Sequence, residues 1–305
     1  MKKELQDKLK KQHYALIGEN SAVQICKYTK ESIRNKDVCY KQKFYGIQSH
    51  RCVQMSPVVM SCEHRCLHCW RPIEFTENSK KFDDPKYIID KAIESQRKML
   101  SGFLGSKGSD KSKFFEAQDP RHFAISLSGE PTLYPYLPEL IKELDKRRIT
   151  SFVVTNGENP DVLKKISPTQ LYISLNAPNE EIFNKLAKPV EGGWKNIFKT
   201  LELLSKLKTR TVIRITLIKN YNMCNEEEYS DLIKKAKPMF IELKAYMHIG
   251  FSQYRLKKEN MPSHSEVKEF AKKISKLTGY KVLDEKENSR VVLLGKSGRN
   301  RFIKF

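Results

Sequence analysis

Three cysteines lie close together in the stretch CEHRCLHCW, with the spacing C-x3-C-x2-C. These residues are Cys62, Cys66 and Cys69, and no fourth cysteine is near them. A structural zinc site needs four protein ligands, and His64 and His68 lie inside the motif, although such short spacing strains a tetrahedral site. Three thiolates can instead hold a [4Fe–4S] cluster, which leaves one iron open to a small molecule. The triad therefore favours an iron–sulfur cluster, and zinc stays as the alternative.

A second set of three cysteines lies upstream at wide and equal spacing, C-x12-C-x12-C. Its members are Cys26, Cys39 and Cys52. Equal spacing alone is a weak signal, because three buried free cysteines would give the same pattern. In a reducing compartment, however, cysteines are more typical of metal binding than of a disulfide framework. Cys224 falls outside both triads, and we assign it no role.

Short apolar runs in the sequence are the expected β-strands, and these strands must position the cysteines. Between the later runs lie segments whose apolar residues recur at helical spacing. Near-continuous apolar strands separated by amphipathic helices indicate a parallel sheet covered by helices. The strands are expected at 56–61, 122–129, 150–157, 170–178, 211–219 and 240–250. The first runs directly into Cys62, and the loops after barrel strands are where α/β barrels build their active sites.

Six strands are too few for a complete eight-stranded barrel, so the expected fold class is α/β, a partial (β/α)6 TIM-type barrel. We expect this barrel at 56–255. Residues 1–55 would form an N-terminal extension that carries the second triad, and 256–305 a basic C-terminal appendage. The stretch 102–120 is expected to be a polar excursion between the first two strands.

Charge and hydropathy indicate the compartment and the kind of partner. Lys and Arg outnumber Asp and Glu by 57 to 36, which gives a formal net charge of +21. Such a balance favours a polyanionic partner, most simply nucleic acid, although a solvated lysine-rich surface would also produce it. The N-terminal segment is charged and lacks the apolar core of a signal peptide, and no apolar stretch approaches the ~20 residues of a membrane span. We therefore expect a cytoplasmic protein.

A triad of this spacing after the first strand of a six-stranded partial barrel resembles the radical S-adenosylmethionine (SAM) enzymes. The resemblance covers roughly residues 56–250. It implies that Cys62, Cys66 and Cys69 hold a [4Fe–4S] cluster whose open iron chelates the amino and carboxylate groups of SAM, and that reductive cleavage releases a 5′-deoxyadenosyl radical. The residue before the third cysteine is usually aromatic in this family. Here it is His68, whose ring can serve the same packing role.

Polar residues at the ends of the expected strands are similar to the SAM-binding segments of that family. In SLSGEPTLYP, Ser128, Gly129 and Glu130 match a glycine-rich segment that contacts the SAM amino group, where glycine permits close approach. The other candidates are Thr155 and Asn156 at the barrel rim, Ser174 and Asn176 for the ribose hydroxyls, and Arg214 for the SAM carboxylate. For each of them, a strand-end cap or a surface group is the alternative.

The second triad, the stretch CYKQKFYGI and the stretch CWRP together resemble the tRNA 4-demethylwyosine synthases, in the form without a flavodoxin domain. The resemblance implies a lyase-type reaction on N1-methylguanosine, which lies next to the anticodon of tRNA-Phe, with pyruvate as co-substrate. The adenosyl radical takes a hydrogen from the N-methyl group, and the carbon radical adds to the pyruvate carbonyl carbon. The pyruvate carboxyl is then lost, and ring closure gives the tricyclic base.

Two [4Fe–4S] clusters suit that scheme. A cluster on Cys26, Cys39 and Cys52 could chelate pyruvate or accept the surplus electron. The family resemblance also implies a lysine that forms a Schiff base with the ketone, and a lysine desolvated near cationic groups becomes nucleophilic. Lys41, in the matching CYK, is the catalytic candidate, and Lys43 follows it. The alternative is a phosphate-binding or solvated lysine.

Basic segments interleaved with aromatic residues suit an anticodon loop. Tyr246, Phe251 and Tyr254 follow the last barrel strand and are candidates for base stacking, with core packing as the alternative. We expect a monomer that takes electrons from a separate donor protein, because residues 1–55 leave no room for a reductase domain. Two other functions stay open: a different radical SAM enzyme with an auxiliary cluster, such as a glycyl-radical activase, and a non-catalytic zinc-bearing RNA-binding protein.

Overall fold

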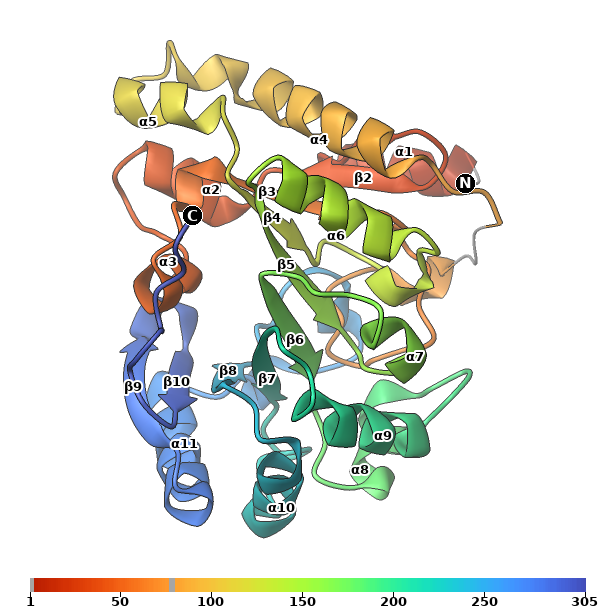
Figure 1. The fold of residues 1–305 in the computed structure, drawn as a ribbon, viewed down its shortest axis with the longest axis vertical. Helices are drawn as coiled ribbons and strands as arrows, with labels where there is room; N and C mark the ends of the chain where they lie inside the picture. Colours follow the sequence, from red (N-terminus) through yellow and green to blue (C-terminus); the bar gives the residue numbers. More distant parts are fainter. Residues whose placement is uncertain (1–2, 77–79) are drawn as a thin grey trace.

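The computed structural model describes residues 3–76 and 80–305. These residues form one ten-stranded sheet with the order β1-β2-β3-β4-β5-β6-β7-β8-β10-β9 (Figure 1). Six neighbouring strands are parallel and make the partial barrel. They are β3 (Cys52–Ser56), β4 (His122–Ile125), β5 (Thr150–Thr155), β6 (Gln170–Ser174), β7 (Arg210–Leu217) and β8 (Phe240–Ala245). The expected class, an incomplete α/β barrel, is confirmed.

The first barrel strand lies earlier than the sequence predicted. The expected strand at 56–61 is wrong, because β3 ends at Ser56 and the residues after it form bends and turns. Val58, Val59 and Met60 are buried there, which gives the segment the apolar pattern of a strand. Met60, however, has φ +68°, which breaks an extended conformation. Cys62 therefore follows a buried turn and does not continue a strand.

Amphipathic helices cover the outer face of the parallel strands (Figure 1). In α6 (Leu137–Lys146), the buried residues Leu137, Leu140, Ile141 and Leu144 recur at helical spacing and belong to the main core. The other helices of the barrel region are α4 (Pro85–Leu100), α5 (Lys111–Ala117), α7 (Pro160–Leu163), α8 (Glu180–Ala187), α9 (Trp194–Leu204) and α10 (Glu226–Ala236). The polar excursion predicted at 102–120 contains α5, so it is partly helical.

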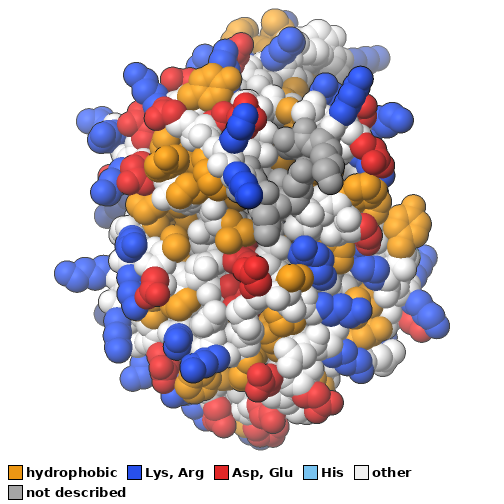
Figure 2. Space-filling model, turned by 90° about the vertical axis from the view of Figure 1, so that its right-hand side faces the viewer, with side chains coloured by type: hydrophobic (Ala, Val, Ile, Leu, Met, Phe, Trp, Pro, Cys, Tyr) orange, Lys and Arg blue, Asp and Glu red, His pale blue; other side chains and the backbone are white. Residues whose placement is uncertain are grey.

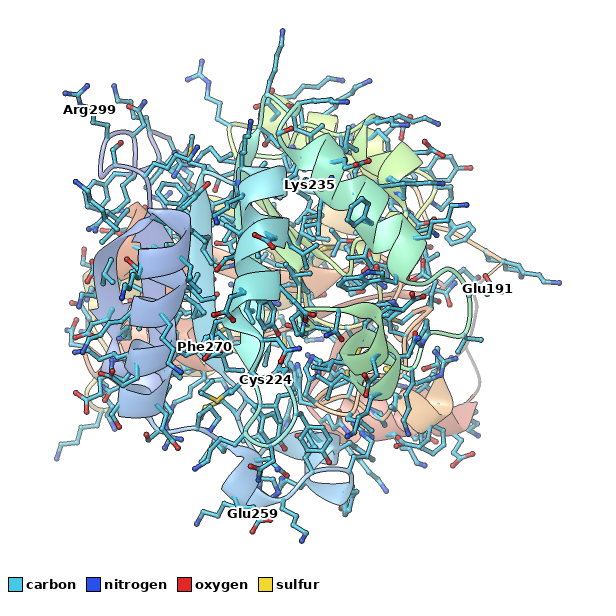
Figure 3. The ribbon with its side chains drawn as sticks, turned by 90° about the horizontal axis from the view of Figure 1, so that it is seen from below. Glu191, Cys224, Lys235, Glu259, Phe270 and Arg299 are labelled. Carbon is cyan, nitrogen blue, oxygen red and sulfur yellow. The ribbon has the colours of Figure 1, made fainter. Side chains whose placement is uncertain are left out.

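Antiparallel strands extend the sheet at both edges. At one edge, β2 (Ser21–Gln24) pairs with β3 and with β1 (Ala15–Ile17), after α1 (Lys3–Lys11). At the other, β10 (Val291–Gly295) pairs with β8 and with β9 (Lys281–Lys286). Helix α11 (His264–Thr278) lies beside α10 (Figure 3). The sheet therefore crosses both boundaries of the division into 1–55, 56–255 and 256–305, which stays a prediction.

Helix α3 (Tyr40–Tyr45), which follows α2 (Lys27–Ile33), fills the lower part of the barrel. Tyr40, Phe44 and Tyr45 pack there against inward-facing rings of the strands, including Phe152 and Tyr172. No helix in the described part of the chain is long and apolar enough to cross a bilayer.

The last ten residues, 296–305, which we call the C-terminal tail, run beneath α3. The Ile303 N–H donates to the Tyr45 carbonyl at 2.9 Å. The Arg210 guanidinium donates from Nη2 to the Arg301 carbonyl at 2.7 Å. The Phe305 ring meets the His122 ring edge-on with centroids 4.7 Å apart. The tail thus closes the floor of the barrel at the end opposite to the loops that carry the first triad.

Candidate active site

A cavity of about 390 Å³ lies at the C-terminal ends of the parallel strands. All three cysteines of the first triad line it. So does every residue that the sequence predicted to bind SAM: Ser128, Gly129, Glu130, Thr155, Asn156, Ser174, Asn176 and Arg214. The fold therefore brings the predicted cofactor-binding residues to one place, because parallel strands end at the same rim of a barrel. Their individual roles toward SAM stay predictions.

The first triad suits a cluster better than a single metal ion. Cys62 and Cys69 lie in buried surroundings, and this burial raises the pKa of the Cys69 thiol to about 12. The backbone N–H of His64 donates to the Cys62 sulfur at 3.4 Å. Among residues 3–76 and 80–305, no three His, Cys, Asp or Glu side chains are close enough to hold one metal ion. Three thiols that line one cavity are the donor set of a cluster that keeps one iron open.

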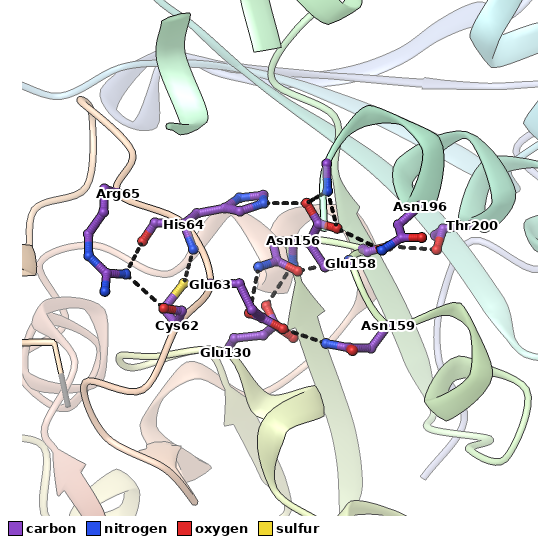
Figure 4. A network of polar contacts seen from close by, with 12 residues as sticks. Cys62, Glu63, His64, Arg65, Glu130, Asn156, Glu158, Asn159, Asn196 and Thr200 are labelled. Carbon is purple, nitrogen blue, oxygen red and sulfur yellow. Dashed lines mark hydrogen bonds and ion pairs between the residues drawn. The ribbon is translucent and has the colours of Figure 1, made fainter. Parts of the chain in front are cut away.

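Both histidines of the motif have protein partners: His64 lies between the Cys66 thiol and a carboxylate, and His68 lies beside Asn176. His64 Nε2 lies 2.8 Å from Glu158 Oε1, and both side chains are buried (Figure 4). Burial lowers the pKa of His64, but Cys66 and Glu158 outweigh it and raise that pKa to about 10. Burial and the charge of Arg214 instead lower the pKa of His68 to about 4, so its ring is neutral. The Nε2 atoms of both rings therefore already have protein partners and are not free to bind zinc.

Gly129 is required for contact between two loops. Its φ is +71°, and a Cβ at this position would lie 2.2 Å from the Val58 carbonyl oxygen and 2.7 Å from that of Ser61. The next residue, Glu130, donates its N–H to the Ser61 carbonyl at 2.6 Å. The loop after β4 thus fixes the turn that leads into Cys62. The close approach that glycine permits here is to the chain itself, and its contact with SAM stays a prediction.

Glu130 ties the ends of two strands together (Figure 4). Its Oε1 accepts the Thr155 hydroxyl at 2.6 Å and the Thr132 hydroxyl at 2.7 Å, and its Oε2 accepts the Asn156 N–H at 2.8 Å. Burial, with the charge of Glu63 added, raises the pKa of this carboxyl. Glu130, Thr155 and Asn156 therefore cap the strand ends, which was the alternative to binding SAM. All three also line the cavity.

Asn176 links the strand ends to the first triad. Its Oδ1 accepts the Thr216 N–H at 2.8 Å, and its Nδ2 lies 3.2 Å from His68 Nε2. Because His68 precedes Cys69, this bond orients the ring beside the cysteine loop. Ser174 and Arg214 line the same cavity from β6 and β7.

The second triad lies inside the barrel, beside α3. Cys26 and Cys39 are the residues before α2 and α3, and Cys52 begins β3. Burial, with the charge of Cys26 added, raises the pKa of Cys39 to about 11 and that of Cys52 to about 12, although the charge of Lys41 lowers both. Backbone N–H groups after Cys26 and Cys39 hydrogen-bond their sulfurs. The fold thus brings these three thiols and Lys41 within electrostatic reach of one another.

Lys41 and Lys43 have opposite surroundings. Lys41 is buried, and its Nζ lies 5.0 Å from the centroid of the Phe152 ring and 4.7 Å from that of Tyr172. Side chains alternate along a strand, so Phe152 points to the same side as Val154, which lines the cavity. Lys41 therefore lies one layer below the cavity floor. Lys43 is half-exposed and forms an ion pair with Asp284 at 3.1 Å.

Lys244 is a cavity residue that the sequence analysis missed. It is on β8, and its Nζ donates to the Ser289 carbonyl at 2.8 Å. Burial, together with the charge of Arg214, lowers the pKa of Lys244 to about 8. A signal was present: Glu242 and Lys244 alternate with apolar residues in the predicted strand, which is unusual for a strand buried on both faces.

The aromatic candidates for base stacking have different environments. Tyr246 is fully buried, and its hydroxyl lies 3.1 Å from Ser252 Oγ, so core packing holds for it. Tyr254 is 83% exposed, with its ring against that of Phe251. Cys224 lies in the loop before α10 (Figure 3).

Arg255 holds the loop of the first triad in place, and its sequence position gave no sign of this. Its guanidinium donates to the carbonyls of Leu67, Cys69 and Arg71 and pairs with Glu74 at 2.6 Å. Three carbonyls on one loop are thus bound by one rigid, planar donor.

We expect Arg255→Ala to weaken iron retention at the first triad by about 10- to 100-fold, the usual cost of removing a residue that supports metal ligands. The measurement is iron content after anaerobic reconstitution, in a background in which Cys26, Cys39 and Cys52 are alanine. Arg255→Lys should restore retention only in part, because one ammonium cannot serve three carbonyls. Lys257→Ala, an exposed neighbour, is the control. Full iron retention in Arg255→Ala would contradict this role.

Comparison with known families places the chain. The radical SAM superfamily model matches residues 57–233, more than half of the chain, and the model for wyosine base formation matches residues 235–296. The barrel with a cysteine triad at its mouth is therefore that of a radical SAM enzyme. An S-adenosyl-L-methionine-dependent tRNA 4-demethylwyosine synthase from Pyrococcus abyssi is 48% identical over 100% of this chain and 94% of its own length. The chain belongs to the tRNA 4-demethylwyosine synthase family.

Solved structures agree with this assignment. A structure of TYW1 with a lysine-pyruvate adduct bound matches with a TM-score of 0.90 and 41% identity, over 99% of this chain and 98% of that one. A crystal structure of archaeal TYW1 matches with a TM-score of 0.83 and 37% identity, over 99% and 100%. The family resemblance in the sequence is thereby confirmed, and with it a SAM-dependent enzyme that uses a [4Fe–4S] cluster.

Proposed function

We propose that this chain converts N1-methylguanosine next to the anticodon of tRNA-Phe to 4-demethylwyosine, with SAM and pyruvate as co-substrates. The observation that carries the proposal is the placement of two reactive centres in one barrel. The first triad lies at the cavity wall, and Lys41 with the second triad lies one layer below the cavity floor. A radical made at the mouth and a ketone held below it would meet in the space between.

The donor sets fit two clusters, one on Cys62, Cys66 and Cys69 and one on Cys26, Cys39 and Cys52. When bound, the first supplies the electron that cleaves SAM to a 5′-deoxyadenosyl radical, and the second offers an open iron for the oxygens of pyruvate. The chain's own residues do the rest. Arg214 and Lys244 give the cavity floor a positive charge that suits carboxylates. Glu130, through Thr155 and Asn156, keeps the strand ends rigid around SAM.

Lys41 is proposed to form the Schiff base with pyruvate. Its amine would add to the ketone carbon, and loss of water would leave an imine that fixes the three-carbon unit below the methyl group of the target base. The rings of Phe152 and Tyr172 around its Nζ exclude water from that bond. The TYW1 structure with a lysine-pyruvate adduct supports a lysine in this role for that protein.

The remaining partners follow from the same proposal. A separate protein would supply the electrons. The anticodon loop would approach the cavity mouth, and the enzyme would act as a cytoplasmic monomer.

The test is anaerobic incubation with reductant, SAM, pyruvate and tRNA-Phe that carries N1-methylguanosine. We expect a fluorescent tricyclic base in the tRNA, with one 5′-deoxyadenosine at least for each base formed. Omission of pyruvate should leave SAM cleavage and abolish the product. SAM cleavage without any change in the tRNA would contradict the proposal and point to another radical SAM reaction.

A further inference from the structure

Trp70 is an exposed tryptophan on the rim of the candidate active site. It lines the cavity directly after Cys69, yet 38% of its surface is accessible to solvent. Ile249, 49% exposed, lines the same cavity from the loop after β8. An exposed large apolar group at the mouth of a cavity is typical of a binding surface.

One face of the indole is held by a buried guanidinium. Arg71 lies 3.2 Å from the centroid of the Trp70 ring and 4.8 Å from that of Tyr14, and it is only 3% exposed. Its Nε donates to the Leu127 carbonyl at 2.7 Å, and its Nη2 has no hydrogen-bond partner. Among the residues that the structure describes, no carboxylate pairs with it. Its contacts therefore serve to hold aromatic rings rather than to form an ion pair.

The backbone of Trp70 is fixed as well. Its carbonyl accepts the Phe251 N–H at 3.0 Å. Gly250 has φ +58°, and a Cβ there would lie 2.5 Å from the same carbonyl oxygen, so the two loops touch where only glycine fits. The indole thus has a fixed backbone, one covered face and an accessible remainder. A ring that is already ordered loses little entropy when a flat partner stacks on it.

The flat partner that best suits this rim is a nucleobase. An enzyme that acts on a base in a loop must unstack it, and aromatic side chains commonly replace the lost stacking. Lys and Arg side chains are spread over the face seen in Figure 2, with acidic and apolar groups between them. Such a diffuse charge attracts RNA but does not orient it. Orientation at the cavity mouth then requires a specific contact.

We propose that Trp70 is a stacking platform for an unpaired base of the substrate's anticodon loop, and that Arg71 is the positioning residue that holds it. This inference rests on the proposed function. The platform would hold the RNA loop at the rim while the target base enters the cavity. Sequence analysis assigned stacking to Tyr246, Phe251 and Tyr254, none of which combines exposure with a place on the cavity wall and a fixed ring.

The chain contains only two tryptophans, which gives a direct readout. The other is Trp194, the first residue of α9, whose ring centroid lies 5.6 Å from that of Phe183 on α8. In a Trp194→Phe holoenzyme, Trp70 is the one indole emitter. Anaerobic titration with an anticodon stem–loop RNA should quench its emission in a saturable way. Time-resolved anisotropy of the same protein should show a rigid ring, and Arg71→Met should make its depolarisation faster.

Affinity measurements complete the test. Trp70→Ala should weaken binding of the stem–loop about tenfold or more, the range expected for loss of one base–aromatic stack. Trp70→Phe should retain most of the affinity. Phe115→Ala is the matched control, because Phe115 is 60% exposed on α5 and does not line the cavity; its affinity should equal that of the parent protein.

The outcomes separate this inference from the proposed function. If the parent enzyme forms the tricyclic base but Trp70 emission does not respond to RNA, or Trp70→Ala binds as tightly as Phe115→Ala, the platform is wrong and the function stands. If the parent enzyme binds no stem–loop and modifies no tRNA, both are overturned.

Discussion

Cys62→Ala is expected to reduce reductive cleavage of SAM to background, whereas Cys26→Ala should retain cleavage and form no tricyclic base. The reason is the separation of the two triads in the fold. Cys62 lines the cavity, where SAM would bind the open iron, and Cys26 lies before α2, inside the barrel. Removal of a cluster ligand should cost more than the roughly 100-fold loss that a supporting residue can cause. 5′-Deoxyadenosine and the modified base are measured in the same reaction.

Cys224→Ala is the matched control for both variants. It removes a partly buried thiol outside the two triads, and it should leave iron content, SAM cleavage and product unchanged. Equal loss of SAM cleavage in Cys62→Ala and Cys26→Ala would contradict separate roles for the triads. Iron content adds a second check, because each triad variant should lose about half of the iron of the parent protein.

Lys41→Ala is expected to abolish both the trapping of pyruvate by borohydride and the formation of product. Its amine is the group that lies beside the second triad and below the cavity floor, enclosed by two aromatic rings. Without it, pyruvate has no covalent anchor there. Trapping with labelled pyruvate, followed by mass spectrometry of the peptide that contains residue 41, measures the bond directly. SAM cleavage in the absence of tRNA is measured alongside it.

Two other lysines make this test discriminating. Lys43→Ala should keep the trapped adduct, because Lys43 is half-exposed, does not line the cavity and pairs with Asp284. Lys244 is the structural competitor, since it lines the cavity and its amine has a pKa of about 8. An adduct that persists in Lys41→Ala and disappears in Lys244→Ala would transfer the Schiff base to Lys244.

The gathering of the SAM-site candidates could be predicted from the sequence because the rule behind it is simple. β-Branched runs alternating with amphipathic helices give parallel strands, and the ends of parallel strands meet at one rim. Gly129, Asn156, Asn176 and Arg214 accordingly line one cavity. The same rule could not predict that Gly129 contacts a neighbouring loop, or that Glu130 binds the end of the next strand. Both features depend on contacts between loops that are distant in the sequence.

The errors have equally specific causes. Residues 56–61 resemble a strand in the sequence because they are apolar and buried, although their backbone is not extended. The positive φ of Met60, which breaks the extension, cannot be predicted from the residue types. The edge strands β2 and β10 pair antiparallel to the barrel, which the βα alternation does not signal. Lys244 could have been noticed from its place in an apolar strand, but Arg255 is one charged residue in a chain rich in Lys and Arg, and only tertiary structure distinguishes it from the many solvated ones.

The way in which the C-terminal tail closes the barrel floor has a consequence for how the protein matures. The tail joins Arg210 and Tyr45, so these contacts form between segments that are far apart along the chain. Contacts of such large sequence separation carry a high loop-closure cost and tend to form late in folding. Until they form, the floor beneath α3 is uncovered. Iron and sulfide would therefore have an additional route to Cys39 during folding, from beneath α3, on the side that the tail covers in the folded protein.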